Sequence, residues 1–193
     1  MDQPLKIEQH IIAGVPFKAS PNYNERPVEE PISLLVVHNI SLPPNQFGGD
    51  YVERLFCNHL DCSEHPYFSQ LVGLEVSAHV FIKRTGEVLQ FVPFNKRAWH
   101  AGVSQFDGKP NCNDFSIGIE LEGADDVPYE DTQYTSLVAV TLALIETYPS
   151  MSIENIVGHS DIAPGRKTDP GPAFDWPRFK SMLENQSARV LHN

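Results

Sequence analysis

Short apolar runs divide this chain into expected strands. Residues 32–38 form a continuous apolar run rich in β-branched residues, which predicts a buried strand covered on both faces. Residues 115–121 alternate between apolar and polar side chains, which predicts a strand with one face in the core. Residues 77–83 and 88–92 flank Thr85-Gly86, a pattern typical of a β-hairpin.

Apolar residues recur at helical spacing in other stretches. A long amphipathic helix is predicted from about residue 130 to 148, where Pro149 stops it. A shorter helix is expected over residues 51–58. Asp175 can serve as the N-cap of a last helix, and we expect that helix to fray after residue 185.

Interleaved strands and helices predict a single α/β domain with a mixed central β-sheet flanked by helices. The domain should span residues 32–185, because 193 residues suit one domain with tails. Residues 1–31 are polar and marked by prolines, so we expect an extended arm that lies over the domain. Residues 186–193 are expected to form a C-terminal tail.

Charge and composition limit the partners. The formal net charge of −11 argues against nucleic acid and favours a small, diffusible substrate. The chain has no apolar run of the ~20 residues that a membrane span needs and no apolar leader at its start, so we expect a cytoplasmic monomer that does not bind membranes. Three cysteines without metal-binding spacing fit free thiols in a reducing compartment.

The segment 158–172 concentrates ionisable residues among glycines and prolines. It carries His159, Lys167 and Asp169, and its prolines exclude a regular helix or a central strand, so we predict a loop. Loops held by a rigid scaffold carry a large share of functional residues. The segment is therefore the first candidate for a site.

Three residues can supply a catalytic zinc site, which takes three protein ligands and leaves a fourth position open. His38 ends the strand at 32–38, and we expect it to join His159 and Asp169 around one Zn²⁺ ion per chain. His159 and Asp169 are ten residues apart, about 33 Å when extended, so the loop must fold back. Pro164-Gly165 between them makes that reversal plausible.

Two accessory groups complete a hydrolytic site. Lys167, two residues before Asp169, would place an ammonium beside the metal, where it can stabilise an oxyanion. Either Glu120 or Glu122 could take a proton from the attacking water, since both point the same way near a strand end. Spacing does not choose between the two glutamates. Two histidines and a carboxylate also match the facial triad of a non-haem iron oxygenase.

Five sequence blocks between about residues 20 and 180 belong to one recognisable pattern. They are Leu-Leu-Val-Val-His-Asn-Ile-Ser-Leu-Pro-Pro (34–44), Val-Ser-Ala-His (76–79), Lys-Arg-Ala-Trp-His-Ala-Gly-Val-Ser (96–104), Cys-Asn-Asp-Phe-Ser-Ile-Gly-Ile-Glu-Leu-Glu-Gly (112–123) and Arg-Lys-Thr-Asp-Pro-Gly-Pro-Ala-Phe-Asp-Trp (166–176). In this order they resemble the cytosolic zinc amidases that act on 1,6-anhydro-N-acetylmuramyl-L-alanine muropeptides and are related to peptidoglycan-recognition proteins.

The resemblance implies hydrolysis of the amide between the lactyl group of 1,6-anhydro-N-acetylmuramic acid and the L-alanine of the stem peptide. Such enzymes serve peptidoglycan recycling and, in many Gram-negative bacteria, keep inducers of β-lactamase low. By position, His38, His159 and Asp169 match the zinc ligands, Glu120 the catalytic acid and base, and Lys167 the transition-state stabiliser. The further matches, to residues near the sugar-peptide cleft, are Asn39, Trp99 and His100.

The chain departs from the resemblance at two positions. Relatives often carry arginine where this chain has Glu75 and Asn111, and such arginines would face the carboxylates of the stem peptide. The alternative function is a non-catalytic muropeptide-binding module. In such modules the third ligand is typically lost, whereas Asp169 is present here.

Overall fold

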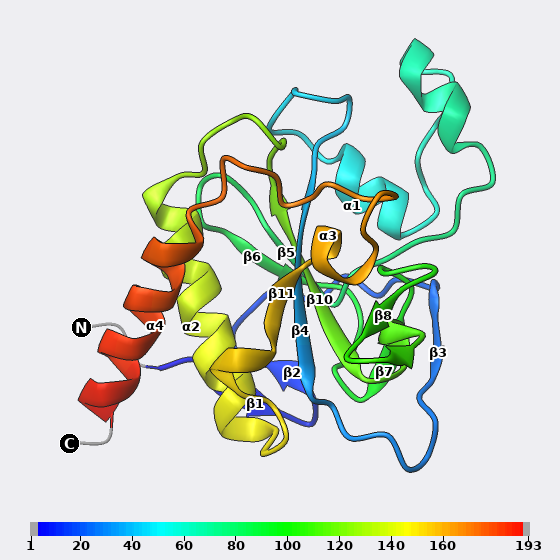
Figure 1. Ribbon diagram of the computed structural model, residues 1–193. Coiled ribbons are helices and arrows are strands. Elements are labelled where there is room, and N and C mark those ends of the chain that lie inside the picture. Colours follow the sequence, from blue (N-terminus) through cyan, green and yellow to red (C-terminus); the bar gives the residue numbers. More distant parts are fainter. Residues whose placement is uncertain (1–3, 191–193) are drawn as a thin grey trace.

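A computed structural model describes residues 4–190 of the chain, built around a five-stranded sheet (Figure 1). The strands lie in the order β11-β4-β10-β5-β6, with bounds β4 Leu34–Ile40, β5 Val80–Ile82, β6 Val88–Gln90, β10 Ser116–Glu122 and β11 Ile156–Gly158. The first four strands in this order are parallel, and β6 pairs antiparallel with β5. The expected mixed sheet is confirmed.

Helices cover both faces of the sheet. The long helices α2 (Asp131–Thr147) and α4 (Trp176–Val190) lie side by side over one face, and the short helices α1 (Tyr51–Phe56) and α3 (His159–Ile162) lie on the other side (Figure 1). The α/β class expected from the sequence is therefore confirmed.

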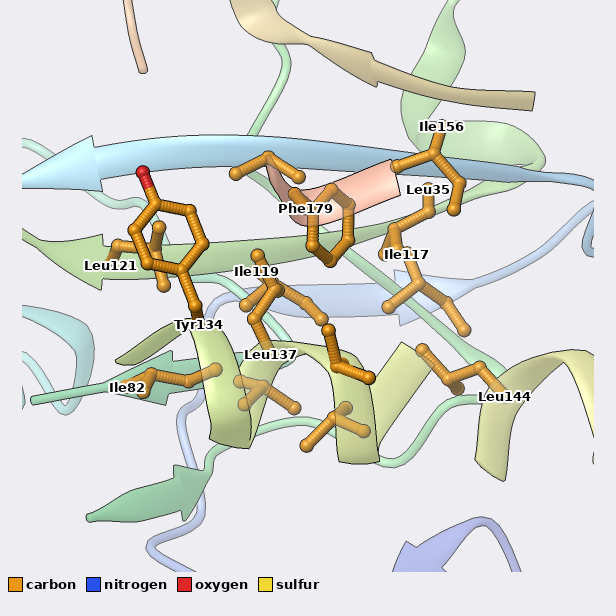
Figure 2. Close-up of a cluster of buried hydrophobic side chains, with 14 of the residues drawn as sticks. Leu35, Ile82, Ile117, Ile119, Leu121, Tyr134, Leu137, Leu144, Ile156 and Phe179 are labelled. Atoms are coloured by element: carbon orange, nitrogen blue, oxygen red, sulfur yellow. The ribbon is translucent and has the colours of Figure 1, made fainter. Parts of the chain in front are cut away.

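Strand periodicity decides which side chains meet which helices. Alternate residues of β4 and β10 enter the core under α2 and α4, which Figure 2 shows in close-up; they are Leu35, Val37, Ile117, Ile119 and Leu121. The intervening residues face the opposite side, where Leu34 and Val36 pack with Ile162 of α3. His38 and Glu120 continue that second face, away from the long helices.

Shorter elements surround the sheet. They are the strand pairs β1 Ile7–Glu8 with β2 Ile11–Ile12, β3 Tyr23–Glu25 with β7 Lys96–Ala98, and β8 Gln105–Phe106 with β9 Lys109–Pro110, and the 3₁₀ turns η1 Pro66–Leu71, η2 Cys112–Asp114 and η3 Ile153–Asn155. The first three strands belong to the predicted N-terminal arm. Within residues 4–31 this arm is anchored in the domain, because Ile12 is buried and Ser20 donates a hydrogen bond to the carbonyl oxygen of Phe56 at 2.6 Å.

The prediction of a loop over residues 158–172 is wrong for its first residues, because His159–Ile162 form the one-turn helix α3. The carboxylate of Asp161 accepts a hydrogen bond from the Gly158 backbone N–H at 2.7 Å, and the N–H of Ala163 bonds to the carbonyl oxygen of His159 at 3.0 Å. This short-range capping forms the turn before the first proline, Pro164.

The C-terminal boundary also differs from the expectation. Asp175 caps α4 as predicted, since its carboxylate accepts from the backbone N–H of Arg178 at 2.9 Å. The helix continues to Val190 instead of fraying after residue 185, because no glycine or proline interrupts residues 178–190. Residues 191–193 of the expected tail and residues 1–3 of the expected arm lie outside the described residues.

Candidate metal centre and cleft

The carboxyl ends of three parallel strands meet at one edge of the sheet. His38 of β4 lies beside Glu120 of β10, and Gly158 of β11 lies beside Val37. Neighbouring strands are about 4.8 Å apart, so His38, Glu120 and the next residue after β11, His159, come together. This edge is where parallel α/β sheets bind ligands.

Three side chains converge just beyond this edge. The Nδ1 atoms of His38 and His159 are 2.9 Å apart, and each lies 3.0 Å from Oδ2 of Asp169. Both rings are buried, and Asp169 is partly buried. Two imidazole nitrogens and a carboxylate oxygen at this spacing can hold a metal ion.

The loop after α3 folds back to deliver the third of these residues. The carbonyl oxygen of Asp169 accepts a hydrogen bond from the backbone N–H of Ser160 at 3.0 Å, which ties the end of the loop to its beginning. The turn between them closes where the N–H of Lys167 bonds to the carbonyl oxygen of Ala163 at 3.1 Å. The reversal expected near Pro164-Gly165 is therefore present.

Burial and hydrogen bonds act in opposite directions on the pKa values of His38 and Asp169. Burial lowers the pKa of His38 to about 4, although Asp169 opposes that effect. Burial alone would raise the pKa of Asp169, but hydrogen bonds from His159 and His38 outweigh it and hold that pKa below its usual range. Neutral imidazole and ionised carboxylate are the forms that bind metals.

The outer nitrogens of the two histidines are also engaged. Nε2 of His159 lies 3.0 Å from the carbonyl oxygen of Ala101, which can accept its proton. Nε2 of His38 lies 2.9 Å from Nδ1 of His100. Both histidines therefore direct Nδ1 at the common point.

A cavity of about 550 Å³ opens beside this candidate metal-binding group, and its lining includes Glu120, Lys167, His159 and Asp169. Oε2 of Glu120 is buried and has no hydrogen-bond partner among residues 4–190. Burial, together with the negative charge of Asp169, raises the pKa of Glu120 well above its usual value, while Lys167 opposes the shift. A buried carboxyl group with a raised pKa beside a cavity is a candidate for proton exchange.

Glu122, the alternative left open by spacing, has a different environment. Its carboxylate accepts hydrogen bonds from the backbone N–H groups of Gly48 and, at 2.9 Å, Arg84. It joins the loop that follows β4 to the hairpin between β5 and β6. Both oxygens are committed to these bonds, and Glu122 is absent from the cavity lining.

The residues expected near the substrate line this cavity as well, namely Asn39, Trp99 and His100. The side-chain nitrogen of Asn39 donates to Oδ1 of Asp125 at 2.8 Å and to the carbonyl oxygen of Pro170 at 3.1 Å. Asn39 thereby holds Pro170, the residue next to Asp169. The expected contact of Asn39 with substrate stays a prediction. Asp125 had no sequence signal, because the pair Asp125-Asp126 in a loop has no distinguishing pattern.

A family model for N-acetylmuramoyl-L-alanine amidase matches residues 28–172, about three quarters of the chain. The chain belongs to the N-acetylmuramoyl-L-alanine amidase family. The matched segment contains the three residues that could hold a metal ion, and also Glu120 and Lys167.

Relatives of this amidase are similar over nearly their full lengths. The 1,6-anhydro-N-acetylmuramyl-L-alanine amidase AmpD of Enterobacter cloacae is 59% identical over 187 residues, which cover 97% of this chain and 100% of the relative. A crystal structure of a selenomethionine AmpD derivative superimposes with a TM-score of 0.89 at 54% identity, covering 92% of this chain and 98% of the other.

A more distant solved structure contains a substrate. It is the amidase AmiD of E. coli in complex with anhydro-N-acetylmuramic acid-L-Ala-D-γ-Glu-L-Lys, with a TM-score of 0.57 and 26% identity, covering 93% of this chain and 66% of that one. Among residues 4–190 of the present amidase, no helix combines the length and apolar character that crossing a membrane requires.

Proposed function

We propose that this amidase hydrolyses the bond between the lactyl group of 1,6-anhydro-N-acetylmuramic acid and the L-alanine of the stem peptide, in the cytoplasm, for peptidoglycan recycling. The names of its relatives and the substrate bound to AmiD support this reaction. Three free cysteines fit a reducing compartment. The single observation that carries the proposal is the buried Oε2 atom of Glu120, which has no hydrogen-bond partner within residues 4–190 and lies beside three residues that could hold a metal.

We infer that the metal is one zinc ion held by His38, His159 and Asp169. Ligand atoms about 2.1 Å from a zinc ion with four ligands would be roughly 3.4 Å apart, so donors that are 2.9–3.0 Å apart would need to separate by only about 0.4–0.5 Å. Two imidazoles and one carboxylate are also ligands that hydrolytic zinc sites use. Bound zinc would polarise the scissile carbonyl and acidify water.

The roles of the protein groups follow from their places around the cavity. Glu120 accepts a proton from the attacking water and gives it to the departing L-alanine amine. Burial moves the pKa of Glu120 upward, toward neutral pH, and such a pKa suits a group that must both take and release a proton. Lys167 contributes a positive charge on the lining, where it stabilises the oxyanion of the tetrahedral intermediate.

The charges near the cavity affect how the stem peptide would be recognised. Leu74 and Val76 line the cavity, and Glu75 between them is exposed. Asn111 is also exposed, so the two positions where the resemblance leads us to expect arginine offer no positive charge here. We therefore propose that this amidase depends less on the acidic end of the stem peptide and more on the sugar and L-alanine.

The test is to replace Glu120 with Gln, which keeps the shape of the side chain and removes its proton acceptor. We expect kcat for an anhydro-muropeptide to fall about 100- to 10,000-fold, with zinc content still near one ion per chain. Peptide release is measured by chromatography and zinc by elemental analysis. Chelation of zinc should abolish activity, and adding zinc back should restore it.

Other outcomes would favour the competing functions. Binding of the muropeptide without release of peptide by the zinc-loaded protein would identify a binding module. Purification with iron in place of zinc, together with oxygen consumption, would identify an oxygenase. An active preparation that contains no metal would contradict the proposal itself.

A further inference from the structure

His38 has a second imidazole ring behind it. Its Nδ1 points at His159 and Asp169, whereas its Nε2 lies 2.9 Å from Nδ1 of His100. The two rings meet edge to face, with centroids 5.0 Å apart and planes at 80°. On its far side, Nε2 of His100 lies 3.2 Å from Oγ of Ser116.

Metal binding fixes where the protons lie along this chain of contacts. An imidazole nitrogen that binds a metal carries no proton, so a neutral His38 bound through Nδ1 carries its proton on Nε2. That proton needs an acceptor, and Nδ1 of His100 is at hydrogen-bonding distance. A neutral His100 that accepts at Nδ1 is protonated at Nε2 and donates to Oγ of Ser116.

The surrounding residues are shaped to hold the His100 ring in this place. Strand β10 carries Gly118 against the ring, and a Cβ atom there would lie only 2.4 Å from the ring carbon Cγ of His100. Behind it, Nδ1 of His79 accepts the backbone N–H of Gly118 at 3.0 Å, and Arg26 donates to the carbonyl oxygen of Ser116 at 2.7 Å.

The backbone of His100 is fixed as well. Its N–H donates to Oδ1 of the Asn113 side chain at 3.2 Å, and the next N–H, of Ala101, donates to the same oxygen at 2.8 Å. Both the ring and the main chain of His100 therefore have one defined position. The ring does line the cavity, but both of its nitrogens already have partners in the protein.

We propose that His100 is a positioning residue for the metal site. Its Nδ1 accepts the hydrogen bond from Nε2–H of His38, and this bond fixes the tautomer and the ring orientation in which His38 presents its own Nδ1 to the metal. The inference rests on the proposed zinc site. It assigns His100 to orientation of a ligand rather than to recognition of the sugar. Replacing the hydrogen-bond partner of a metal-binding histidine typically lowers metal affinity 10- to 100-fold.

The experiment compares His100→Leu with His100→Asn. Leucine removes the acceptor, whereas the amide oxygen of asparagine can occupy the place of Nδ1 and accept the His38 proton. We expect zinc affinity, measured by competition with a chromophoric chelator, to fall about 10- to 100-fold in His100→Leu and to recover at least in part in His100→Asn. His59→Leu, which removes an exposed histidine, is the matched control and should bind zinc like the parent.

A second measurement does not depend on the variants folding. Long-range ¹H–¹⁵N spectra of the zinc-loaded parent identify which nitrogen of each histidine carries a proton. We expect protons on Nε2 of both His38 and His100. A proton on Nδ1 of His100 overturns the inference, whatever the variants do.

The outcomes also separate this inference from the proposed function. A parent that binds zinc and releases peptide, with His100→Leu binding zinc equally tightly, overturns the positioning role and leaves the amidase intact. Equal losses of affinity in His100→Leu and His100→Asn also overturn it, because the acceptor would then not matter. A parent that binds no zinc overturns both proposals.

Discussion

At the scale of single residues, the contrast between Glu120 and Glu122 shows how environment assigns a role. The two glutamates are two positions apart on the same strand and point the same way. Glu122 accepts two backbone N–H groups, which are strong partners for an ionised carboxylate. Glu120 has a buried oxygen without a partner among residues 4–190, so it is available for chemistry.

This contrast predicts different effects for the same substitution. Glu122→Gln places an amide NH₂ group against one of the two backbone donors, which should lower the free energy of unfolding by about 1–3 kcal/mol. The loop after β4 carries Pro44 and Asn45 of the cavity wall, so KM should rise more than kcat falls. Urea unfolding and steady-state kinetics measure the two effects.

Hydrogen exchange gives a direct readout for this variant. The amide of Gly48 loses its carboxylate partner in Glu122→Gln and should exchange faster than in the parent. Glu120→Gln is the matched comparison, because it should leave that exchange rate unchanged while it lowers kcat. If Glu122→Gln instead lowers kcat as strongly as Glu120→Gln with normal stability, the assignment of the two glutamates is wrong.

At the scale of elements, strand β10 carries a single glycine, Gly118, between Ser116 and Glu120 on the face beside the candidate metal site. Gly118 leaves room for the ring of His100, and Glu120 follows two residues later at the strand end. The opposite face of the strand is apolar and packs under α2 (Figure 2). The same strand therefore builds the core with one face and the site with the other.

We predict that Gly118→Ala lowers the free energy of unfolding by about 1–3 kcal/mol, because its methyl group would overlap the His100 ring. The double variant with His100→Ala removes the obstacle. Its loss of stability should be smaller than the sum of the two single losses by more than about 0.5 kcal/mol. Thermal or urea unfolding of the four proteins tests this, and additive losses would show that the two residues do not oppose each other.

At the scale of the whole molecule, the N-terminal arm and the sheet bury a histidine beside an arginine. His79 is fully buried, and its Nε2 lies 3.1 Å from Nη2 of Arg26, which comes from the arm. Burial, with a smaller contribution from the positive charge of Arg26, lowers the pKa of His79 from 6.5 to about 3. The folded protein therefore holds this histidine neutral over a pH range in which the unfolded chain protonates it.

The stability of the molecule should accordingly fall in mild acid. The contribution of His79 is complete above pH 6.5 and is lost as the pH falls toward 3, at up to about 1.4 kcal/mol per pH unit, because only the unfolded chain binds the proton. His79→Asn retains an acceptor for the Gly118 N–H and cannot titrate. Between pH 6 and 4.5, metal-free His79→Asn should lose stability less steeply than the metal-free parent, as measured by urea unfolding, and equal slopes would contradict the assignment.

The sequence by itself determined the order of the main strands and helices along the chain. Strand β4, strand β10 and helices α2 and α4 follow from side-chain periodicity, which is a local property of the residues. Blocks of residue types also indicated the family and nominated His38, His159 and Asp169. The turn at α3 was not predicted, because one capping contact from Asp161 outweighed the glycine and proline content of the segment around it.

The tertiary structure decided which of these residues act together. Only the parallel pairing of β11, β4 and β10 brings His38, His159 and Glu120 to one edge, since contacts across more than a hundred residues depend on strand order and not on local pattern. The choice of Glu120 over Glu122 likewise required the positions of Gly48 and Arg84, whose backbone groups satisfy one carboxylate and leave the other facing the cavity. Periodicity fixes the face on which a side chain lies, whereas its partners are fixed by packing.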